Sequence, residues 1–344
     1  MLNIFELPSH QISGDTKMAW FIWGEKKSGK TTLACSFPKP LLIALEHGYR
    51  AISNKELKVA PCQDWNQFKA IVKQLEAQAK EVKNGKLPAT TFETVIIDSA
   101  DILYNSLINY VCSLHGVSDL GDTPNKCGYK QAAQLFEVEV LKLLRAVNQY
   151  NENLYNVIFI SHADAPKEVK DVVTKVKQLR YTPTIDKRAN AIIQKHVDVS
   201  CMLTTSMDEA GVERRLAVFR SPIAEVGSRY PYLPNAVDLS YDNIKNAINE
   251  AVQKQVEVDG MTTTTTNSMV ATAEVEYDFN TLMNEAKALY GMFEAAGYAR
   301  DFAIAVEKVL GVGHRISDCT EHQAEAVYAV VVELKEKATA LGIA

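Results

Sequence analysis

The stretch FIWGEKKSGKTTLA, residues 21–34, runs from apolar residues straight into a turn rich in glycine and lysine. Residues 24–31 satisfy the pattern GxxxxGK[ST], which binds phosphate when it follows a strand and opens a helix. AWFIW, residues 19–23, is typical of a buried strand. Glycines let the backbone wrap an anion, so that N–H groups point at its oxygens. The predicted nucleotide-binding residues are Gly24, Glu25, Lys26, Lys27, Ser28, Gly29, Lys30, Thr31 and Thr32.

Within this phosphate-binding loop (P-loop), Lys30 is expected to reach the β- and γ-phosphates of ATP, and the Thr31 hydroxyl to bind Mg²⁺. A second carboxylate for the metal is expected at Asp98, which ends the apolar run TVIID about 70 residues further on. We expect this strand beside the P-loop strand. The alternative is that Asp98 only caps the helix that follows it.

Two further polar residues end apolar strands. Glu46 follows LLIAL and is a candidate general base, which would polarise the water that attacks the γ-phosphate. The alternative for Glu46 is an exposed carboxylate at a strand end. His162 follows NVIFIS and is a candidate sensor that would convert the presence of the γ-phosphate into a loop movement. The alternative for His162 is a structural histidine.

Composition and periodicity set the fold class. Short apolar runs alternate with helical segments, which predicts an α/β core with a mostly parallel sheet and helices on both faces. VERRLAVF, residues 212–219, alternates and predicts an antiparallel hairpin at one edge. The six cysteines form no CxxC pair, which argues against a zinc site or a disulfide framework. No run of 18 apolar residues occurs, so we expect a cytoplasmic protein without a membrane segment.

The predicted domains follow from a change of composition near residue 258. Residues 1–257 carry the α/β pattern, and residues 258–276 form a polar, threonine-rich run that predicts a flexible linker. Residues 277–344 have helical periodicity interrupted by glycines, which predicts a small all-α domain.

The P-loop, the ALEH and VIIDS segments and a polar residue that ends the next strand occur in an order that resembles the RecA-like recombinases. More closely, the chain resembles the Sak-type RecA-like single-strand annealing proteins of phages, often labelled AAA-family phage nucleotide-binding proteins. The resemblance covers roughly residues 18–250. It implies a RecA-like P-loop ATPase with Glu46 as the water-activating residue and Asp98 on the metal side. His162 stands where RecA carries a nucleotide-sensing glutamine, a departure from the family.

The same resemblance implies two loops that bind single-stranded DNA, residues 113–128 and 163–195. The second contains eight Lys or Arg against four Asp or Glu, in a chain with net charge −5. Such a basic patch with an aromatic platform suits binding to a nucleic-acid backbone. The alternative is a solvated hairpin with alternating charges. The predicted DNA-binding residues are Lys167, Lys170, Lys175, Lys177, Arg180, Tyr181, Lys187 and Arg188.

Oligomeric P-loop ATPases often complete their site with an arginine from a neighbouring subunit. Arg220 and Arg229 are the candidates here, and a surface ion pair is the alternative for each. We therefore expect a homo-oligomer, either a ring or a filament. The C-terminal helices are a candidate docking module for a protein partner.

Together these observations predict a Mg²⁺-dependent ATPase that binds single-stranded DNA in phage recombination or strand annealing, in the cytoplasm of the bacterial host. A small-molecule kinase needs the same P-loop and is the first alternative. A nucleotide-gated interaction protein that does not hydrolyse ATP is the second. The response of ATP hydrolysis to single-stranded DNA separates the three.

Overall fold

The computed structural model describes residues 12–13, 17–147, 154–170, 175–207, 210–264 and 278–343. The chain divides into two compact units, Met1–Ala271 and Thr272–Ala344. Helix α6, Tyr241–Asp259, includes the first two residues of the predicted linker. Most of that linker, residues 265–276, lies outside the described residues. Just before it, Thr263–Thr264 (β13) pairs in parallel with Ile12–Ser13 (β1).

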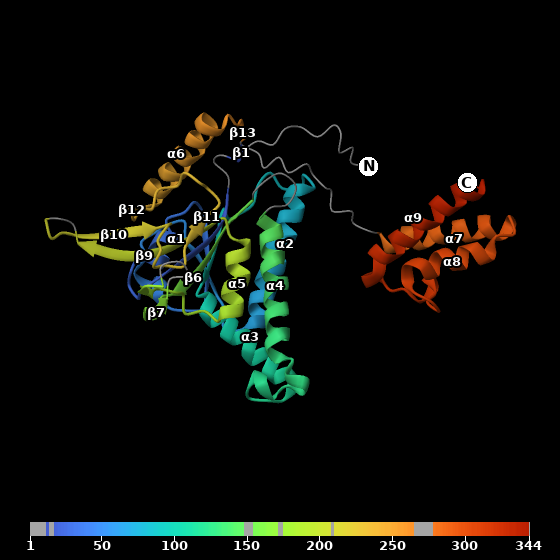
Figure 1. The fold of residues 1–344 in the computed structure, drawn as a ribbon, viewed down its shortest axis with the longest axis horizontal. Helices are drawn as coiled ribbons and strands as arrows, with labels where there is room; N and C mark the ends of the chain where they lie inside the picture. The colour runs from blue at the N-terminus through green and yellow to red at the C-terminus, as the bar shows by residue number, and fades with distance from the viewer. Residues whose placement is uncertain are drawn as a thin grey trace. The chain divides into compact units, whose positions relative to one another are not determined.

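The first unit is built on a sheet whose strands lie in the order β12-β10-β9-β2-β6-β5-β3-β4, with β11 also paired with β9 (Figure 1). All strands from β9 to β4 in this order are parallel, and β10, β11 and β12 are antiparallel. This is the mostly parallel P-loop core with antiparallel edge strands that the sequence predicts, and the four core strands predicted in AWFIW, LLIAL, TVIID and NVIFIS are present. The strands are β2 Ala19–Gly24, β3 Pro40–Ala44, β4 Lys58–Pro61, β5 Thr94–Asp98, β6 Asn156–His162, β9 Val199–Met207, β10 Glu213–Val218, β11 Gly227–Ser228 and β12 Ala236–Asp238.

The position of β5 differs from expectation. We expected the strand that ends in Asp98 to lie beside the P-loop strand, and this was wrong because β6 pairs with β2 on one side and with β5 on the other. A strand that is apolar on both faces fits any interior position of a parallel sheet, so its sequence pattern does not determine its neighbours.

Helices cover both faces of the sheet, and the side chains of β2 alternate between them. Phe21 and Trp23 pack in the cluster formed with α2, α3, α4 and α5. Trp20 and Ile22 pack in the opposite cluster with α1 and α6. The helices are α1 Lys30–Ala34, α2 Trp65–Lys83, α3 Ala100–His115, α4 Gly128–Val147 and α5 Lys187–His196. The helical periodicity of QAAQLFEVEVLKLLRAVNQY, residues 131–150, predicts this helix as far as Tyr150, but residues 148–150 lie outside the described part.

The stretch 163–195, expected as a loop, contains regular structure. Lys167–Lys170 (β7) pairs antiparallel with Lys177–Arg180 (β8), and α5 follows. Residues 171–174 lie between these strands and are not described. The basic stretch is therefore a hairpin followed by a helix, and its charges are divided between the two.

The second unit consists of α7 Phe279–Ala295, α8 Ala299–Leu310 and α9 Ala324–Leu341. Their apolar faces form one core, in which Phe293, Val327, Val330 and Leu334 are fully buried. Nowhere in the described ranges is a helix both long and apolar enough to cross a membrane.

Gly24, the last residue of β2, is held against the neighbouring strand. Its φ is +155°, and a Cβ built on it would lie 2.4 Å from the carbonyl oxygen of Leu203 in β9. That separation is shorter than any real Cβ contact, and the obstacle is backbone, so it cannot move aside cheaply. Only glycine lets β9 run this close to the start of the P-loop.

We predict that Gly24→Ala lowers the free energy of unfolding by about 3 kcal/mol or more, because the methyl group forces β2 and β9 apart. Gly85→Ala is the matched control, since Gly85 also has a positive φ of 69° but no atom within 4 Å of its Cβ position. That control is expected to lose only about 1 kcal/mol. Urea unfolding of both variants measures the difference, and equal losses would contradict the close approach.

Candidate functional site

The P-loop joins β2 to α1 and has the backbone of an anion-binding loop. Lys27 and Gly29 adopt left-handed conformations, with φ of 65° and 95°. Gly29 is the N-cap of α1 and its carbonyl accepts the amide of Leu33 at 2.8 Å. Alternation of left- and right-handed residues turns successive N–H groups towards one concave side. The loop thus has the shape that the motif predicts.

Lys30 lies inside this loop. Its side chain is 5% exposed, and its ammonium donates hydrogen bonds to the carbonyls of Gly24 at 2.9 Å and Glu25 at 2.7 Å. Burial lowers the pKa of Lys30, while the nearby carboxylates of Asp98 and Glu46 oppose that shift. Lys30 is thus a buried cation at the loop, held by backbone oxygens.

Asp98 and Thr31 meet across the site. The Thr31 hydroxyl donates to Oδ2 of Asp98 at 2.8 Å. Burial raises the pKa of Asp98, and the hydrogen bond from Thr31 opposes the shift. The N-cap of α3 is Ser99 rather than Asp98, so the capping alternative for Asp98 is wrong. Thr31 and Asp98, the two residues predicted to bind the metal, are therefore in direct contact, although β6 lies between β2 and β5.

Glu46 is tied to two neighbours. Its Oε1 accepts the hydroxyl of Ser99 at 2.5 Å and lies 3.3 Å from Nε2 of His162. The hydrogen bond with His162 contributes most to a lowered pKa of Glu46, burial opposes it, and the bond from Ser99 lowers it further. Glu46 is therefore held as a carboxylate near neutral pH. The contact between Glu46 and His162, distant in sequence, was not expected.

A third carboxylate, Asp101, was missed by the sequence analysis. Its Oδ1 accepts the hydroxyls of Ser161, at 3.0 Å, and Thr184. Burial raises the pKa of Asp101, and these two hydrogen bonds oppose the shift. Asp101 follows Asp98 by three residues in the first turn of α3. That spacing was the available signal, since it places Asp101 near the edge where β5 and β6 end.

Three buried polar atoms at this site have no hydrogen-bond partner among the described residues. They are Oγ of Ser28 in the P-loop, Nδ1 of His162 and Oδ2 of Asp101. Buried polar groups are normally paired, and each exception calls for a reason. Their gathering around Lys30 and Asp98 points to a polar ligand.

Three arginines of the edge-strand region have different neighbours within the chain. Nη1 of Arg215, on β10, lies 3.9 Å from the Cβ position of Gly29 in the P-loop. Arg220 donates to the carbonyl of Tyr230 at 2.9 Å, and Arg229 lies 3.4 Å from Asp198. Arg215, which was not selected, is thus the arginine beside the P-loop of its own chain. The role of Arg220 and Arg229 in a neighbouring subunit stays a prediction.

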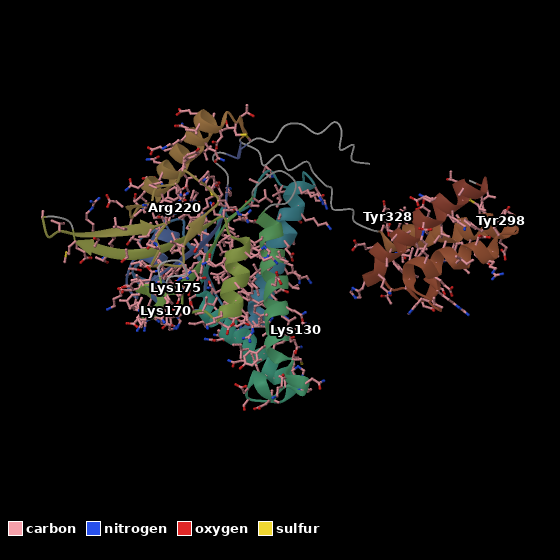
Figure 2. The ribbon with its side chains drawn as sticks, in the orientation of Figure 1. Lys130, Lys170, Lys175, Arg220, Tyr298 and Tyr328 are labelled. Carbon is pink, nitrogen blue, oxygen red and sulfur yellow. The ribbon has the colours of Figure 1, made fainter. Side chains whose placement is uncertain are left out.

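The predicted DNA-binding residues separate into two groups. Lys167, Lys170, Lys175, Lys177 and Arg180 lie on the β7–β8 hairpin, where Figure 2 labels Lys170 and Lys175. Within the hairpin, Lys177 pairs with Glu168 at 2.8 Å and Lys167 pairs with Asp164.

The second group lies beyond the hairpin. Lys187 and Arg188 begin α5, and Arg188 stacks over the ring of Tyr129 with 4.5 Å to its centroid. Tyr181 is half-buried against the core, so it is less open for stacking on a base than expected.

The first predicted DNA loop, residues 113–128, is compact. Its first residues end α3, and short 3₁₀ turns at 120–122 and 124–126 follow. The buried Thr123 hydroxyl accepts the amide of Gly128 at 2.7 Å. A 16-residue helix spans about 24 Å. This loop and Asp98 are therefore at opposite ends of α3.

Comparison with known proteins agrees with the site. Residues 16–230 match a family described as AAA domain, and the chain belongs to that family. Its first unit has the fold of an AAA-type P-loop nucleotide-binding domain. Over 324 residues the chain is 26% identical to the SPbeta prophage-derived uncharacterized protein YorG of Bacillus subtilis (strain 168). The match covers 92% of this chain and 92% of that protein.

Among solved structures, one similar chain is a prototypical ATPase from the type III secretion system of pathogenic bacteria. The match has a TM-score of 0.38 and 11% identity, and covers 91% of this chain and 80% of that one. A likeness at this level carries no argument about function.

We predict that His162→Ala raises the pKa of Glu46 towards its ordinary value, because the largest stabilisation of the carboxylate is removed. Ser99→Ala should raise it by a smaller amount. A pH titration of the side-chain carboxyls by ¹³C NMR measures both shifts. Glu93, whose pKa is lowered mainly by Lys39, is the internal control. An unchanged pKa of Glu46 in both variants would contradict the arrangement.

Proposed function

We propose that this chain binds and hydrolyses ATP with Mg²⁺ between the P-loop and the ends of β5, β3 and β6, and that its nucleotide state controls binding of single-stranded DNA. The observation that most supports this proposal is that Lys30, Asp98 and Glu46 meet at one edge of the sheet. Around them lie the three buried polar atoms that have no hydrogen-bond partner among the described residues. We place this activity in phage recombination or strand annealing, in the host cytoplasm. The prophage origin of the relative supports that setting.

Nucleotide binding is proposed to begin with an exchange of partners at Lys30. In the structure its ammonium is held by two loop carbonyls. Phosphate oxygens are stronger acceptors for an ammonium group than neutral carbonyls, because the hydrogen bond is then charge-assisted. Lys30 would therefore turn to the β- and γ-phosphates, and the Ser28 hydroxyl would gain a partner.

The residues at Asp98 fit a magnesium ion. A buried carboxylate and a hydroxyl in contact at 2.8 Å offer the hard oxygen ligands that Mg²⁺ prefers. Thr31 and Asp98 would hold the ion, which would neutralise charge on the phosphates. Since burial raises the pKa of Asp98, a cation would also stabilise its ionised form.

Glu46 is proposed as the general base. A base must be unprotonated before the reaction, and the hydrogen bonds from His162 and Ser99 keep Glu46 ionised. Those contacts also fix the direction of the carboxylate. His162 is thus a positioning residue for Glu46 in addition to its proposed role as sensor.

Backbone hydrogen bonds connect this site to the basic hairpin. The amide of Ala163 donates to the carbonyl of Gly24 at 2.9 Å, and the amide of Thr184 donates to the carbonyl of His162 at 2.9 Å. Thr184 also bonds Asp101. Both ends of the segment that carries β7 and β8 are therefore fastened to residues of the site. A change at the γ-phosphate would be transmitted to the hairpin through these bonds.

The hairpin is the proposed DNA-binding element. Lys170 and Arg180 are exposed and have no ion-pair partner among the described residues. The ion pairs of Lys167 and Lys177 are exposed too, so a phosphate can replace the carboxylate with little loss. Exposed Val176 and Leu179 add apolar surface beside these charges. We also propose a homo-oligomer, ring or filament, in which Arg220 or Arg229 contacts the neighbouring site.

For nucleotide binding, we predict that Lys30→Ala weakens ATP affinity about a hundredfold, because a charge-assisted contact is lost. Glu46→Gln should bind ATP within about threefold of wild type and lose turnover by a factor of about 10² to 10⁴. Isothermal titration calorimetry and phosphate release measure the two effects. Lys55→Ala, an exposed lysine away from the loop, is the control.

These variants also separate the alternatives. Wild-type turnover stimulated by single-stranded DNA supports the proposal. Transfer of phosphate to a small acceptor would identify a kinase instead, and tight ATP binding without turnover would identify a nucleotide-gated interaction protein. Equal turnover in Glu46→Gln and wild type would remove Glu46 from the mechanism.

For DNA binding, we predict that the double variant Lys170→Glu, Arg180→Glu weakens binding to oligothymidine and reduces the salt slope by about 1.4, since each lost contact to a single strand contributes about 0.7. The pair Lys55→Glu, Lys130→Glu has the same change of charge away from the hairpin and should bind as wild type. Fluorescence anisotropy over a range of salt measures both. Unchanged binding in the hairpin variant would move the DNA site elsewhere.

A further inference from the structure

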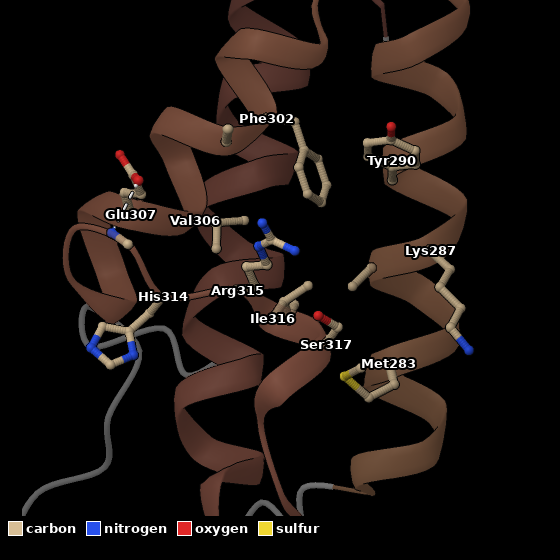
Figure 3. Close-up of a pocket in the computed structure, with 13 residues that line it drawn as sticks. Met283, Lys287, Tyr290, Phe302, Val306, Glu307, His314, Arg315, Ile316 and Ser317 are labelled. Atoms are coloured by element: carbon tan, nitrogen blue, oxygen red, sulfur yellow. Dashed lines mark hydrogen bonds between the residues drawn. The ribbon is translucent and has the colours of Figure 1, made fainter.

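The second unit contains a cavity of about 610 Å³ that the ATPase site does not use. It lies between α7 and α8 and is closed at one end by the loop 311–317 (Figure 3). This volume is within the range of sites that bind small ligands or a few side chains of a peptide.

The walls of this cavity are apolar and well fixed. Phe302 from α8 is buried, and its ring contacts that of Tyr290 from α7 edge to face, with 5.1 Å between centroids. The hydroxyl of Tyr290 donates to Glu294 at 3.1 Å, which holds the ring in place. Met283 and Val306 complete the apolar surface that Figure 3 shows facing the cavity.

The loop that closes the cavity is held by its own hydrogen bonds. Gly311 and Gly313 have φ of 96° and 83°, which allow a tight turn after α8. The carboxylate of Glu307 accepts the amide of Gly313 at 3.1 Å. Glu307, the one acidic residue in the lining, therefore has a backbone partner and is directed at the loop.

The two flexible cations of the lining are unpaired. Lys287 and Arg315 have no hydrogen-bond or ion-pair partner for their side chains within residues 278–343, and Figure 3 shows the guanidinium of Arg315 between the two helices. Lysines elsewhere on this unit do have partners. Lys308 pairs with Glu333 at 2.6 Å, Lys335 with Glu285 at 2.6 Å and Lys337 with Asp301 at 3.2 Å.

We propose that this cavity is a docking site for a peptide segment of a partner protein that presents apolar side chains beside carboxylates. The apolar side chain enters between Met283, Phe302 and Val306, and a carboxylate meets Arg315. Arginine and carboxylate form strong, directional hydrogen bonds, and aromatic walls supply most of the buried area in such sites.

The charge of the whole unit argues against nucleic acid as the occupant. Residues 278–343 carry ten Asp or Glu and six Lys or Arg. A polyanion would be repelled by that surface, since its affinity depends on many cations over a long contact. One or two carboxylates on an apolar segment need only Arg315, because Figure 3 shows the ammonium of Lys287 directed away from the cavity.

The test uses the full-length protein and a fluorescein-labelled peptide of about twelve residues in which Leu and Phe lie beside two Asp and the other positions are Ser. Fluorescence anisotropy should show saturable binding that is about tenfold weaker when Asn replaces Asp, or when Ser replaces Leu and Phe. Arg315→Glu should weaken binding about tenfold, and Ala303→Trp should do the same by filling the cavity.

Two variants serve as matched controls. Arg300→Glu reverses a charge outside the cavity, and Ile304→Trp enlarges an exposed side chain that lies next to Ala303 but outside the lining. Both should bind as wild type. Arg315→Gln, which removes the charge without reversing it, is the second charge variant should Arg315→Glu fail to fold.

Absence of saturable binding by the wild type would overturn the proposal, as would equal losses in the controls or equal binding of the Asn peptide. Loss of oligothymidine binding in Arg315→Glu, without peptide binding, would identify nucleic acid as the occupant and would overturn it as well. ATP hydrolysis is not part of this readout, so the outcome is independent of the ATPase proposal.

Discussion

The close meeting of three strands at Gly24 is the constraint on which the ATPase site depends. The Cα of Gly24 lies against the backbone of Leu203. The carbonyl of Gly24 accepts hydrogen bonds from both the Lys30 ammonium and the amide of Ala163. One residue thus links β2, β9 and the end of β6. The P-loop leaves the sheet at this point, so the N–H groups of the loop, the buried lysine and the start of the hairpin segment all lie next to Gly24.

The electrostatics of the site follow from that convergence. Parallel strands bring Glu46, Asp98 and Asp101 to one edge, and like charges this close would repel each other without compensation. The buried ammonium of Lys30 and the hydroxyls of Thr31, Ser99 and Ser161 provide it. Burial still raises the pKa values of Asp98 and Asp101, while Glu46 is held below its ordinary range. Carboxylates in such different environments are suited to different tasks. The environment of Asp98 suits binding of a metal ion, and that of Glu46 suits accepting a proton.

Local sequence patterns predicted much of the fold and of the candidate site. The remaining features depend on pairing between strands that are distant in sequence. GxxxxGK[ST] sets its own loop geometry, and TVIID has the short, β-branched, apolar pattern of a buried strand, so the positions of Lys30, Thr31 and Asp98 were predicted from sequence. The position of β6 between β2 and β5 was not, because strand order is decided by the crossovers. The contact between Glu46 and His162 depends on that order and could not be predicted, whereas the spacing of three residues from Asp98 was an available signal for Asp101. Arg215 was overlooked because only the pairing of β10 with β9 brings it to Gly29.

The central claim is that a nucleoside triphosphate binds in the P-loop and is sensed by the hairpin through Gly24 and His162. Hydrogen–deuterium exchange with and without Mg²⁺ and a non-hydrolysable ATP analogue tests it most directly. The account predicts slower exchange both at residues 24–32 and at residues 163–184 when the analogue is bound. Unchanged exchange at residues 24–32 under saturating nucleotide would contradict binding at the loop, and a change confined to that loop would contradict its coupling to the hairpin.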